Sequence, residues 1–133
     1  MGIRSDLDAD FDFEIVDEFL DHYSMMVDSM EVMILDLSNN NIYERSVNEL
    51  FRVFHNIKSA SGYLQITSMF KLASFVEDEL EALRHRNPPV SEETTNWLLA
   101  ISDMFAAWND DLKLDNKLSK IKYSLLKIPD LEK

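Results

Sequence analysis

Apolar residues recur at steps of three and four along most of the chain, and this period limits the fold more than any other feature of the sequence. The pattern divides into four stretches, each with one apolar stripe. We therefore expect four long amphipathic helices, over about residues 13–37, 44–64, 68–86 and 92–112. Their stripes, in chain order, are Phe13, Val16, Phe19, Leu20, Tyr23, Val27, Met30, Ile34 and Leu37; Val47, Leu50, Phe51, Phe54, Ile57 and Leu64; Met69, Leu72, Ala73, Val76, Leu80 and Leu83; and Trp97, Leu98, Ile101, Met104, Phe105, Trp108 and Leu112.

Glycine and proline are scarce, which permits helices of this length. The 133 residues include only two glycines and three prolines, and Val, Ile and Thr dominate no stretch, so the composition favours helix over sheet. Short polar residues at 38–41 and the prolines in the segment 87–89 mark helix ends. Thr67 or Ser68 can cap the third helix, and Ser91 is a good cap for the fourth.

The order and spacing of these helices predict an all-α fold. Four helices on short connections form an up-down four-helix bundle. The apolar residues Leu118, Ile121 and Leu125 predict a short fifth helix behind it. Residues 1–10 are polar and are expected to form a flexible lead-in. Residues 11–133 are then one bundle domain, without an internal repeat.

Charge and residue types exclude several classes of partner and site. The formal net charge of −12 opposes binding to nucleic acid and to anionic lipid. The absence of cysteine excludes disulfides and thiolate metal sites. No apolar run approaches the roughly 20 residues of a membrane span, and no segment has the pattern of a signal peptide. We therefore expect a cytoplasmic protein that does not bind membranes.

The remaining polar residues predict no metal or nucleotide site. The acidic residues of the first third are interpreted as a solvated helix face. Calcium binding is the alternative, but the aspartate-rich segment 6–12 lacks the glycine at loop position six and the glutamate at position twelve of an EF-hand. His22 and His85 are interpreted as surface residues without chemistry. The histidines lack the H-E-x-x-H spacing of a metal site, and no glycine-rich loop is present for a nucleotide.

The segment from Phe51 to Leu64 carries the chemistry of this sequence. On a helix, its apolar set faces the core, and a second, partly solvated face carries groups three, four and seven residues apart. The core-facing set is Phe51, Phe54, Ile57, Ser61 and Leu64, and the second face holds Arg52, His55, Lys58, Ser59 and Gly62. The second face therefore combines an imidazole, a cation one turn on, and a glycine one turn beyond.

This combination suits phosphoryl transfer through His55. Neutral imidazole is a good nucleophile, and a phosphoryl group on it can move on to a carboxylate. Lys58, three residues after His55, can hold phosphoryl oxygens as a point charge. Gly62 removes side-chain bulk where a partner must approach. Glycine inside a helix costs about 0.5–1 kcal/mol relative to alanine, so its presence needs such a reason.

The segment from His55 to Leu64 resembles the signature of histidine phosphotransfer (HPt) domains. That signature has a lysine three residues after the histidine, small residues at the fourth to seventh positions, and an apolar residue near the ninth. The stretch from Leu72 to Arg84 is similar to the matching helix in the amino-terminal phosphotransfer domain of chemotaxis histidine kinases. In that subgroup a glutamate hydrogen-bonds the phosphorylatable histidine, and Glu77 stands at the corresponding position. The resemblance implies an HPt-like bundle over most of the chain.

Two residues depart from the family pattern. The family usually has glycine after the ninth-position apolar residue, where the chain turns, and this chain has Gln65. The chemotaxis-type helix usually has a histidine three residues before its glutamate, and this chain has Ser74. Gln65 affects the turn after the histidine-bearing helix. Ser74 affects whether the chain belongs to the chemotaxis subgroup. Both leave His55 and Lys58 in place.

The resemblance implies an intermediate of a two-component phosphorelay. A histidine kinase, or the phosphorylated receiver domain of a response regulator, would donate the phosphoryl group to His55. A receiver aspartate, with the receiver's own Mg²⁺, would then take it. Glu77 would orient the ring through Nδ1, and Lys58, with Ser59 nearby, would steady the phosphoryl group. The domain would act as a monomer with no cofactor of its own. Without an ATP site, it would carry the phosphoryl group but would not be a complete kinase.

The partner is expected to dock on the exposed part of the 44–64 helix and neighbouring residues of the 13–37 helix. Such surfaces combine an apolar patch with a polar rim. Arg52, Lys58 and Lys71 keep the surroundings of His55 less negative than the rest of the chain. The alternative function is a catalytically silent helical interaction domain, which a buried His55 ring would favour. Both a stand-alone relay protein and the input domain of a larger kinase fit the sequence.

Overall fold

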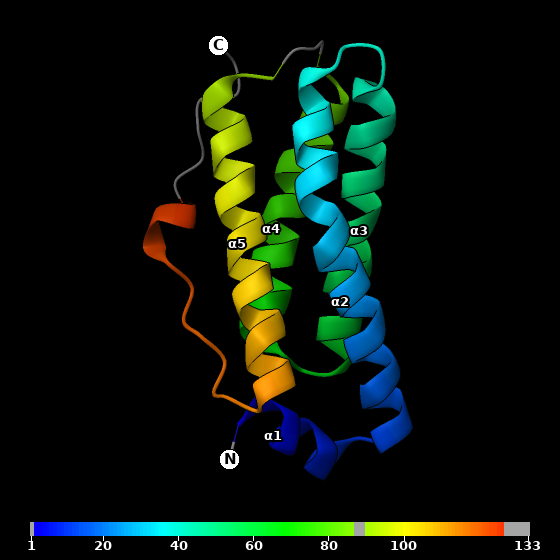
Figure 1. Cartoon of the computed structure of the whole chain (residues 1–133), viewed down its shortest axis with the longest axis vertical. Helices are drawn as coiled ribbons and strands as arrows, with labels where there is room; N and C mark the ends of the chain where they lie inside the picture. The colour runs from blue at the N-terminus through cyan, green and yellow to red at the C-terminus, as the bar shows by residue number, and fades with distance from the viewer. Residues whose placement is uncertain (1, 87–89, 127–133) are drawn as a thin grey trace.

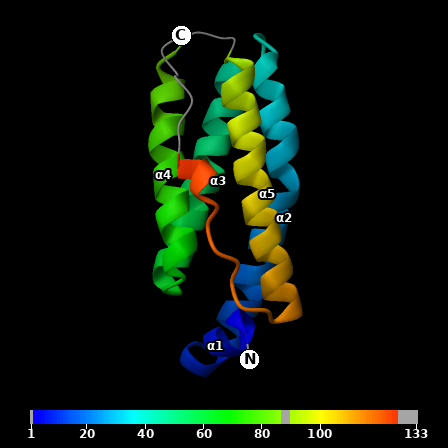
Figure 2. The same cartoon turned by 90° about the vertical axis from the view of Figure 1, so that its left-hand side faces the viewer.

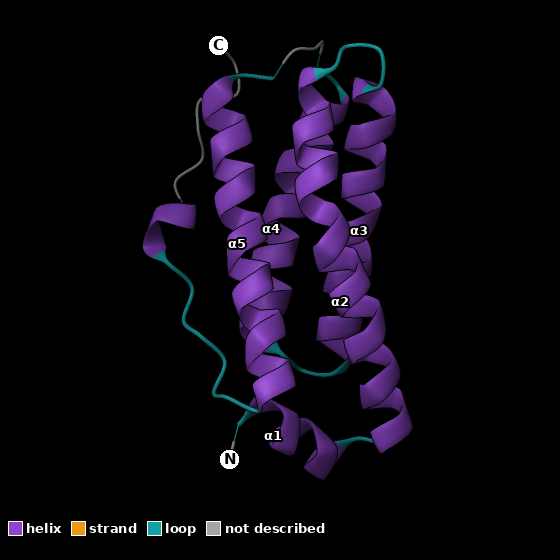
Figure 3. Ribbon diagram, in the orientation of Figure 1, coloured by secondary structure: helices purple, strands orange, loops and turns teal. Residues whose placement is uncertain are grey.

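Four long α-helices run side by side in the computed structural model, which describes residues 2–86 and 90–126 (Figure 1). They are α2 (Phe13–Leu35), α3 (Tyr43–Tyr63), α4 (Thr67–Arg84) and α5 (Glu92–Leu114). Consecutive helices alternate in direction, and the regular structure of the described residues is all helical (Figure 3). The predicted all-α up-down bundle is therefore confirmed.

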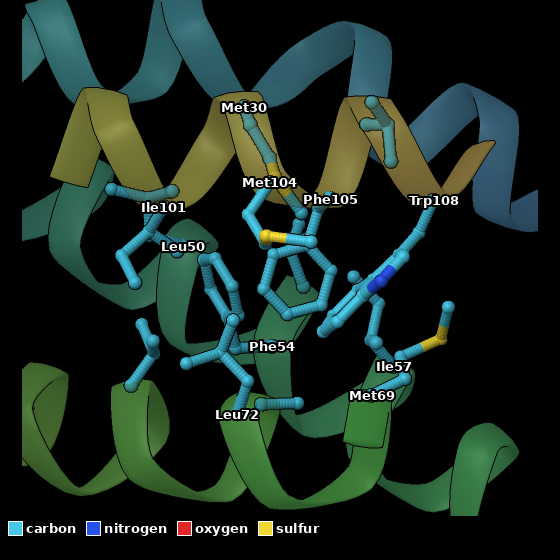
Figure 4. Close-up of a cluster of buried hydrophobic side chains, with 14 of the residues drawn as sticks. Met30, Leu50, Phe54, Ile57, Met69, Leu72, Ile101, Met104, Phe105 and Trp108 are labelled. Carbon is cyan, nitrogen blue, oxygen red and sulfur yellow. The ribbon is translucent and has the colours of Figure 1, made fainter. Parts of the chain in front are cut away.

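The apolar stripes of the four long helices meet in one core (Figure 4). α3 packs along α4, and α2 packs against both α3 and α5. The ring of Phe105 on α5 meets Phe54 edge to face at 5.3 Å and Trp108 at 5.1 Å, and all three side chains are fully buried. Because Phe54 precedes His55 in the sequence, this core fixes the part of α3 that carries the histidine.

The ends of the helices follow the sequence signals only in part. Ser91 caps α5, because its Oγ accepts a hydrogen bond from the amide of Thr94 at 3.1 Å. α4 begins at Thr67, and Ile66 takes the cap position without a side-chain hydrogen bond. The prediction of a threonine or serine cap there is wrong, because the tight turn after α3 puts the buried Ile66 at that position. The proline stop at 87–89 lies outside the described residues.

The first long helix is slightly shorter than its apolar stripe. α2 ends at Leu35 and continues as the 3₁₀ turn η1 (Asp36–Ser38), which still buries Leu37. The stripe therefore extends into a different type of helix. None of the described helices combines the length and the apolar character that crossing a bilayer requires.

The amino-terminal segment differs from the predicted flexible lead-in. Residues 3–10 form the helix α1 (Ile3–Asp10), which lies at the end of the bundle and packs against α5 and α2 (Figures 1 and 2). Leu7 is buried there. The carboxylate of Asp115 accepts hydrogen bonds from the amide of Ser5, at 2.9 Å, and from the Ser5 hydroxyl. Apolar packing of Ile3 and Leu7, and long-range hydrogen bonds from Ile3 and Ser5 to the end of α5, thus order a segment of polar composition.

The short helix predicted after α5 is smaller than its apolar spacing indicates. The chain instead runs back irregularly along the bundle and forms only the 3₁₀ turn η2 (Tyr123–Leu126) (Figure 2). Two indole groups hold it: Trp108 Nε1 donates to the carbonyl of Ser119 at 2.7 Å, and Trp97 Nε1 donates to the carbonyl of Leu125 at 2.9 Å. An irregular path leaves these carbonyls free to accept from the indoles.

Candidate functional site

His55 lies on α3 beside α4, with its ring open to solvent. Its side chain is 56% exposed, although the preceding residue, Phe54, is fully buried. Successive residues of an α-helix are about 100° apart, so burial of Phe54 turns His55 to the outer edge of the bundle. The structure therefore presents this imidazole to an approaching partner.

Glu77 on α4 faces both His55 and Lys58. Its Oε2 lies 3.2 Å from Nδ1 of His55, and its Oε1 lies 3.6 Å from Nζ of Lys58. The Glu77 side chain is only 13% exposed, so this carboxylate is largely shielded between the two helices. Contact at Nδ1 leaves Nε2 as the outward nitrogen of the ring. The three residues that the sequence singled out are thus brought together.

Three further predicted residues surround this group. Arg52 and Ser59 are exposed on the same helix as His55. Gly62 is also exposed, but it has a neighbour within the protein. A Cβ atom at this position would lie 3.1 Å from Cδ1 of Phe70 on α4. The absence of a side chain at Gly62 therefore leaves room for the Phe70 ring.

The two departures from the family pattern have clear local geometry. Gln65 has a φ of 60°, in the left-handed region, and its amide donates to the carbonyl of Gly62 at 3.2 Å. The amide of Ile66 donates to the carbonyl of Ser61 at 2.9 Å. These two bonds form a Schellman motif at the end of α3. The chain therefore turns here with glutamine at the position where the family pattern has glycine. The Ser74 hydroxyl donates to a carbonyl of its own helix, at 2.8 Å.

Two residues that contact the site were not identified from the sequence. Phe51, which was assigned to the core, is only half-buried, and its ring lies parallel to the His55 ring at 6.3 Å and 8°. The guanidinium of Arg84 lies 4.6 Å from the centre of the Phe51 ring. The four-residue step from Phe51 to His55 was the available signal, because residues at that spacing are neighbours on a helix.

Arg84 is itself held by a carboxylate of α4. Its Nη1 lies 2.9 Å from Glu81 Oε2, and Nε2 of His85 lies 3.0 Å from Glu81 Oε1. The hydrogen bond with His85 and the nearby charge of Arg84 lower the pKa of Glu81. The ionised form of Glu81 is therefore favoured, and it pairs with Arg84 at the surface of α4.

A groove of about 460 Å³ lies between α2 and α3. Its floor is apolar, and its lining includes the exposed side chains of Ile15 and Tyr63, which are 42% and 61% exposed. Its polar lining is Glu18, His22 and Asn56. Asn56 follows His55 in the sequence, so this side of the groove lies about 100° around α3 from the histidine. His22, interpreted as a plain surface residue, lines this groove.

The described residues contain no group of three or more His, Asp or Glu side chains placed to hold a metal ion. The aspartate-rich segment 6–12 forms the larger part of α1 and the short connection to α2. Asp12 caps α2, because its carboxylate accepts a hydrogen bond from the amide of Glu14 at 2.8 Å.

Comparison with known proteins identifies one family and one distant relative. Residues 14–113 match the family model described as the Hpt domain, a span that contains His55, Lys58 and Glu77. The Chemotaxis protein CheA of Borreliella burgdorferi is 25% identical over 116 residues, which cover 84% of this chain. The aligned part is 13% of the length of that relative. No solved structure matched the chain.

Proposed function

Since the chain belongs to the Hpt domain family, we propose that His55 is its phosphoacceptor and exchanges the phosphoryl group with an aspartate of a receiver domain. Hpt domains are histidine phosphotransfer modules of phosphorelays. The observation that carries the assignment to His55 is its exposed ring, held at Nδ1 by Glu77 at 3.2 Å. The phosphate in such relays derives from ATP, so we expect the exchange to take place in the cytoplasm. We also expect the domain to act as a monomer.

The geometry supports a transfer with a simple balance of bonds and protons. The lone pair of His55 Nε2 attacks the phosphorus of the donor, the N–P bond forms, and the P–O bond to the donor oxygen breaks. The proton on Nδ1 stays in place. The ring then carries a positive charge, which the carboxylate of Glu77 balances. In the onward step an aspartate oxygen of the receiver attacks phosphorus, and the N–P bond breaks.

Lys58 is the residue we propose to steady the phosphoryl group. In the structure its ammonium lies 3.6 Å from Glu77 and is one third exposed. A lysine side chain is long and has several rotatable bonds. It can therefore turn from the carboxylate to a phosphoryl oxygen on Nε2 without any change in the backbone. Ser59 and Arg52, on the same helix, lie toward the solvent beside this group.

The groove between α2 and α3 is the docking surface that we propose for the receiver. It combines an apolar floor with a polar rim, the composition of a protein–protein contact. It begins about 100° around α3 from His55, so a receiver seated there can extend over the exposed face of α3 and bring its aspartate to Nε2. The basic side chains of Arg52 and Lys58 reduce the negative potential at this place in a chain of net charge −12.

The exposure of His55 bears on the alternative of a catalytically silent interaction domain. That alternative predicts a ring that is buried or covered by another helix. The His55 side chain is 56% exposed, which favours transfer chemistry over a silent domain.

The proposed function is tested by phosphoryl transfer from a panel of receiver domains loaded with radioactive acetyl phosphate in Mg²⁺ buffer. We expect acid-labile, base-stable label on the wild-type chain and none on His55→Gln. His85→Gln is the matched control, because His85 is exposed and contacts Glu81 instead; it should keep the label. Label that persists on His55→Gln refutes the assignment, and a chain that no receiver or kinase labels supports the silent alternative.

A further inference from the structure

Phe51 and Arg84 form a stacked contact that ends on the His55 ring. The Phe51 and His55 rings are parallel within 8°, with centres 6.3 Å apart, which is an offset-stacked geometry. The Arg84 guanidinium lies over the Phe51 ring at 4.6 Å, within the range of a cation–π contact. The imidazole therefore has an ordered neighbour on one face, in addition to its hydrogen bond at Nδ1.

The hydrogen bond that His55 Nδ1 donates to Glu77 leaves one motion of the ring free. A single hydrogen bond fixes one atom, here Nδ1, but the ring can still rotate about the line that joins Nδ1 to the carboxylate oxygen. A 56% exposed side chain has little other packing to prevent this rotation. A parallel aromatic ring opposes it, because rotation would break the stacking. The hydrogen bond and the stacking together define both the position and the plane of the imidazole.

We infer that Phe51 is a positioning residue that sets the plane of the His55 ring, and that Arg84 holds Phe51 in this orientation. The inference rests on the proposed function of His55. Transfer requires the Nε2 lone pair to point at phosphorus, in line with the bond that breaks, and misorientation lowers the rate of such a step.

α4 supplies the carboxylate that binds Nδ1 of His55 and the guanidinium that lies over the Phe51 ring. Glu77 and Arg84 are seven residues apart, which is about two turns, so both side chains lie on the side of α4 that faces α3. Arg84 is fixed in turn by its ion pair with Glu81 at 2.9 Å. A shift of α4 relative to α3 would therefore change the hydrogen bond and the stacking together.

Phe51→Leu tests the inference, with Phe51→Tyr as the variant that retains the ring. Nitrogen-15 NMR of the unphosphorylated protein reports the tautomer and the mobility of the His55 ring, and receiver titrations give the maximal transfer rate and the half-saturating receiver concentration. We expect Phe51→Leu to loosen the ring and to lower the maximal rate roughly two- to tenfold. The half-saturating concentration should not change, and Phe51→Tyr should restore both readouts. Arg84→Gln should shift both readouts in the same direction as Phe51→Leu.

Phe13→Leu is the matched control, because Arg4 lies over the Phe13 ring at 4.8 Å, far along the sequence from the histidine. It removes the same type of Arg–Phe contact and should leave the His55 ring and the transfer rate unchanged. Thermal unfolding of each variant shows whether the fold is intact.

The outcomes separate the inference from the proposed function. A His55 ring as ordered in Phe51→Leu as in the wild type would overturn the positioning role, and so would a rate loss that Phe51→Tyr fails to restore. A normal ring and rate in Arg84→Gln would overturn the part played by Arg84. If the wild type itself takes no phosphate, the proposed function fails. The NMR measurement still decides in that case whether Phe51 orients the ring, because it needs no partner.

Discussion

Replacement of Gln65 by glycine should stabilise the domain. Gln65 occupies the left-handed region, with a φ of 60°, at the turn from α3 to α4. A side chain with a Cβ atom is disfavoured there by roughly 1–2 kcal/mol, whereas glycine is not. The Gln65 side chain is exposed, so its removal loses little packing. Both hydrogen bonds of the turn are made by the backbone and survive the substitution.

The size of the effect follows from two opposing terms. Relief of the backbone strain contributes roughly 1–2 kcal/mol. The greater conformational freedom of glycine in the unfolded chain lowers the free energy of unfolding by roughly 0.4–1 kcal/mol. The difference lies between about 0 and 1.6 kcal/mol, so we expect Gln65→Gly to raise the free energy of unfolding by about 0.8 kcal/mol, and the Tm by about 2–5 °C for a chain of this length.

Urea and thermal unfolding of both proteins give the measurement. Asp115→Gly is the matched comparison, because Asp115 is also left-handed, with a φ of 54°, at the end of α5. Its carboxylate accepts two hydrogen bonds from Ser5, so glycine there should lower stability. A fall in stability for Gln65→Gly, or an equal gain for Asp115→Gly, would refute the reasoning from backbone strain.

Three further perturbations probe other parts of the structure. Glu77→Ala should slow phosphotransfer roughly tenfold in single-turnover assays, because a charge-assisted hydrogen bond to His55 is lost; an unchanged rate, with Ser74→Ala as control, would contradict the orienting role. Tyr23→Phe should lower the free energy of unfolding by about 1 kcal/mol, because its buried hydroxyl donates to an α5 carbonyl at 2.6 Å, and equal unfolding curves would argue against this. Hydrogen bonds from α1 lower the pKa of Asp115, so its contribution to stability is complete above about pH 3.9 and is lost as the pH falls below that value. Urea midpoints between pH 5 and 2 should therefore fall less steeply in Asp115→Asn, and parallel curves would count against the contact.

The four long helices were predictable from the sequence because their signals are local. An apolar stripe with a 3.6-residue period can be recognised from residues that are close together in the sequence. Ser91, which marks the start of α5, is a local signal of the same kind. α1 has no such stripe. Its helix depends on the burial of Leu7 and on the contact between Ser5 and Asp115, which are 110 residues apart. No local pattern records a contact of that kind.

The same distinction between local and long-range signals explains why the segment after α5 is less helical than its sequence predicts. Leucines and an isoleucine at helical spacing predicted a helix, but the indoles of Trp97 and Trp108 bind carbonyls that a helix would use internally. Tertiary contacts therefore override the local preference. Phe51 shows a smaller case. Its place at the edge of the stripe fits both the core and the site, and only the packing of α4 against α3 decides between them.

α3 carries the proposed docking groove on its α2 side and the His55–Glu77 contact on its α4 side. Groups on different sides of a helix share few neighbours, so substitutions on the two sides should combine additively. A lineage can therefore change Ala60 or Tyr63 to suit a different receiver while the residues around the imidazole stay as they are. Such a helix lets duplicated copies of one relay module diverge in their partners and keep one chemistry.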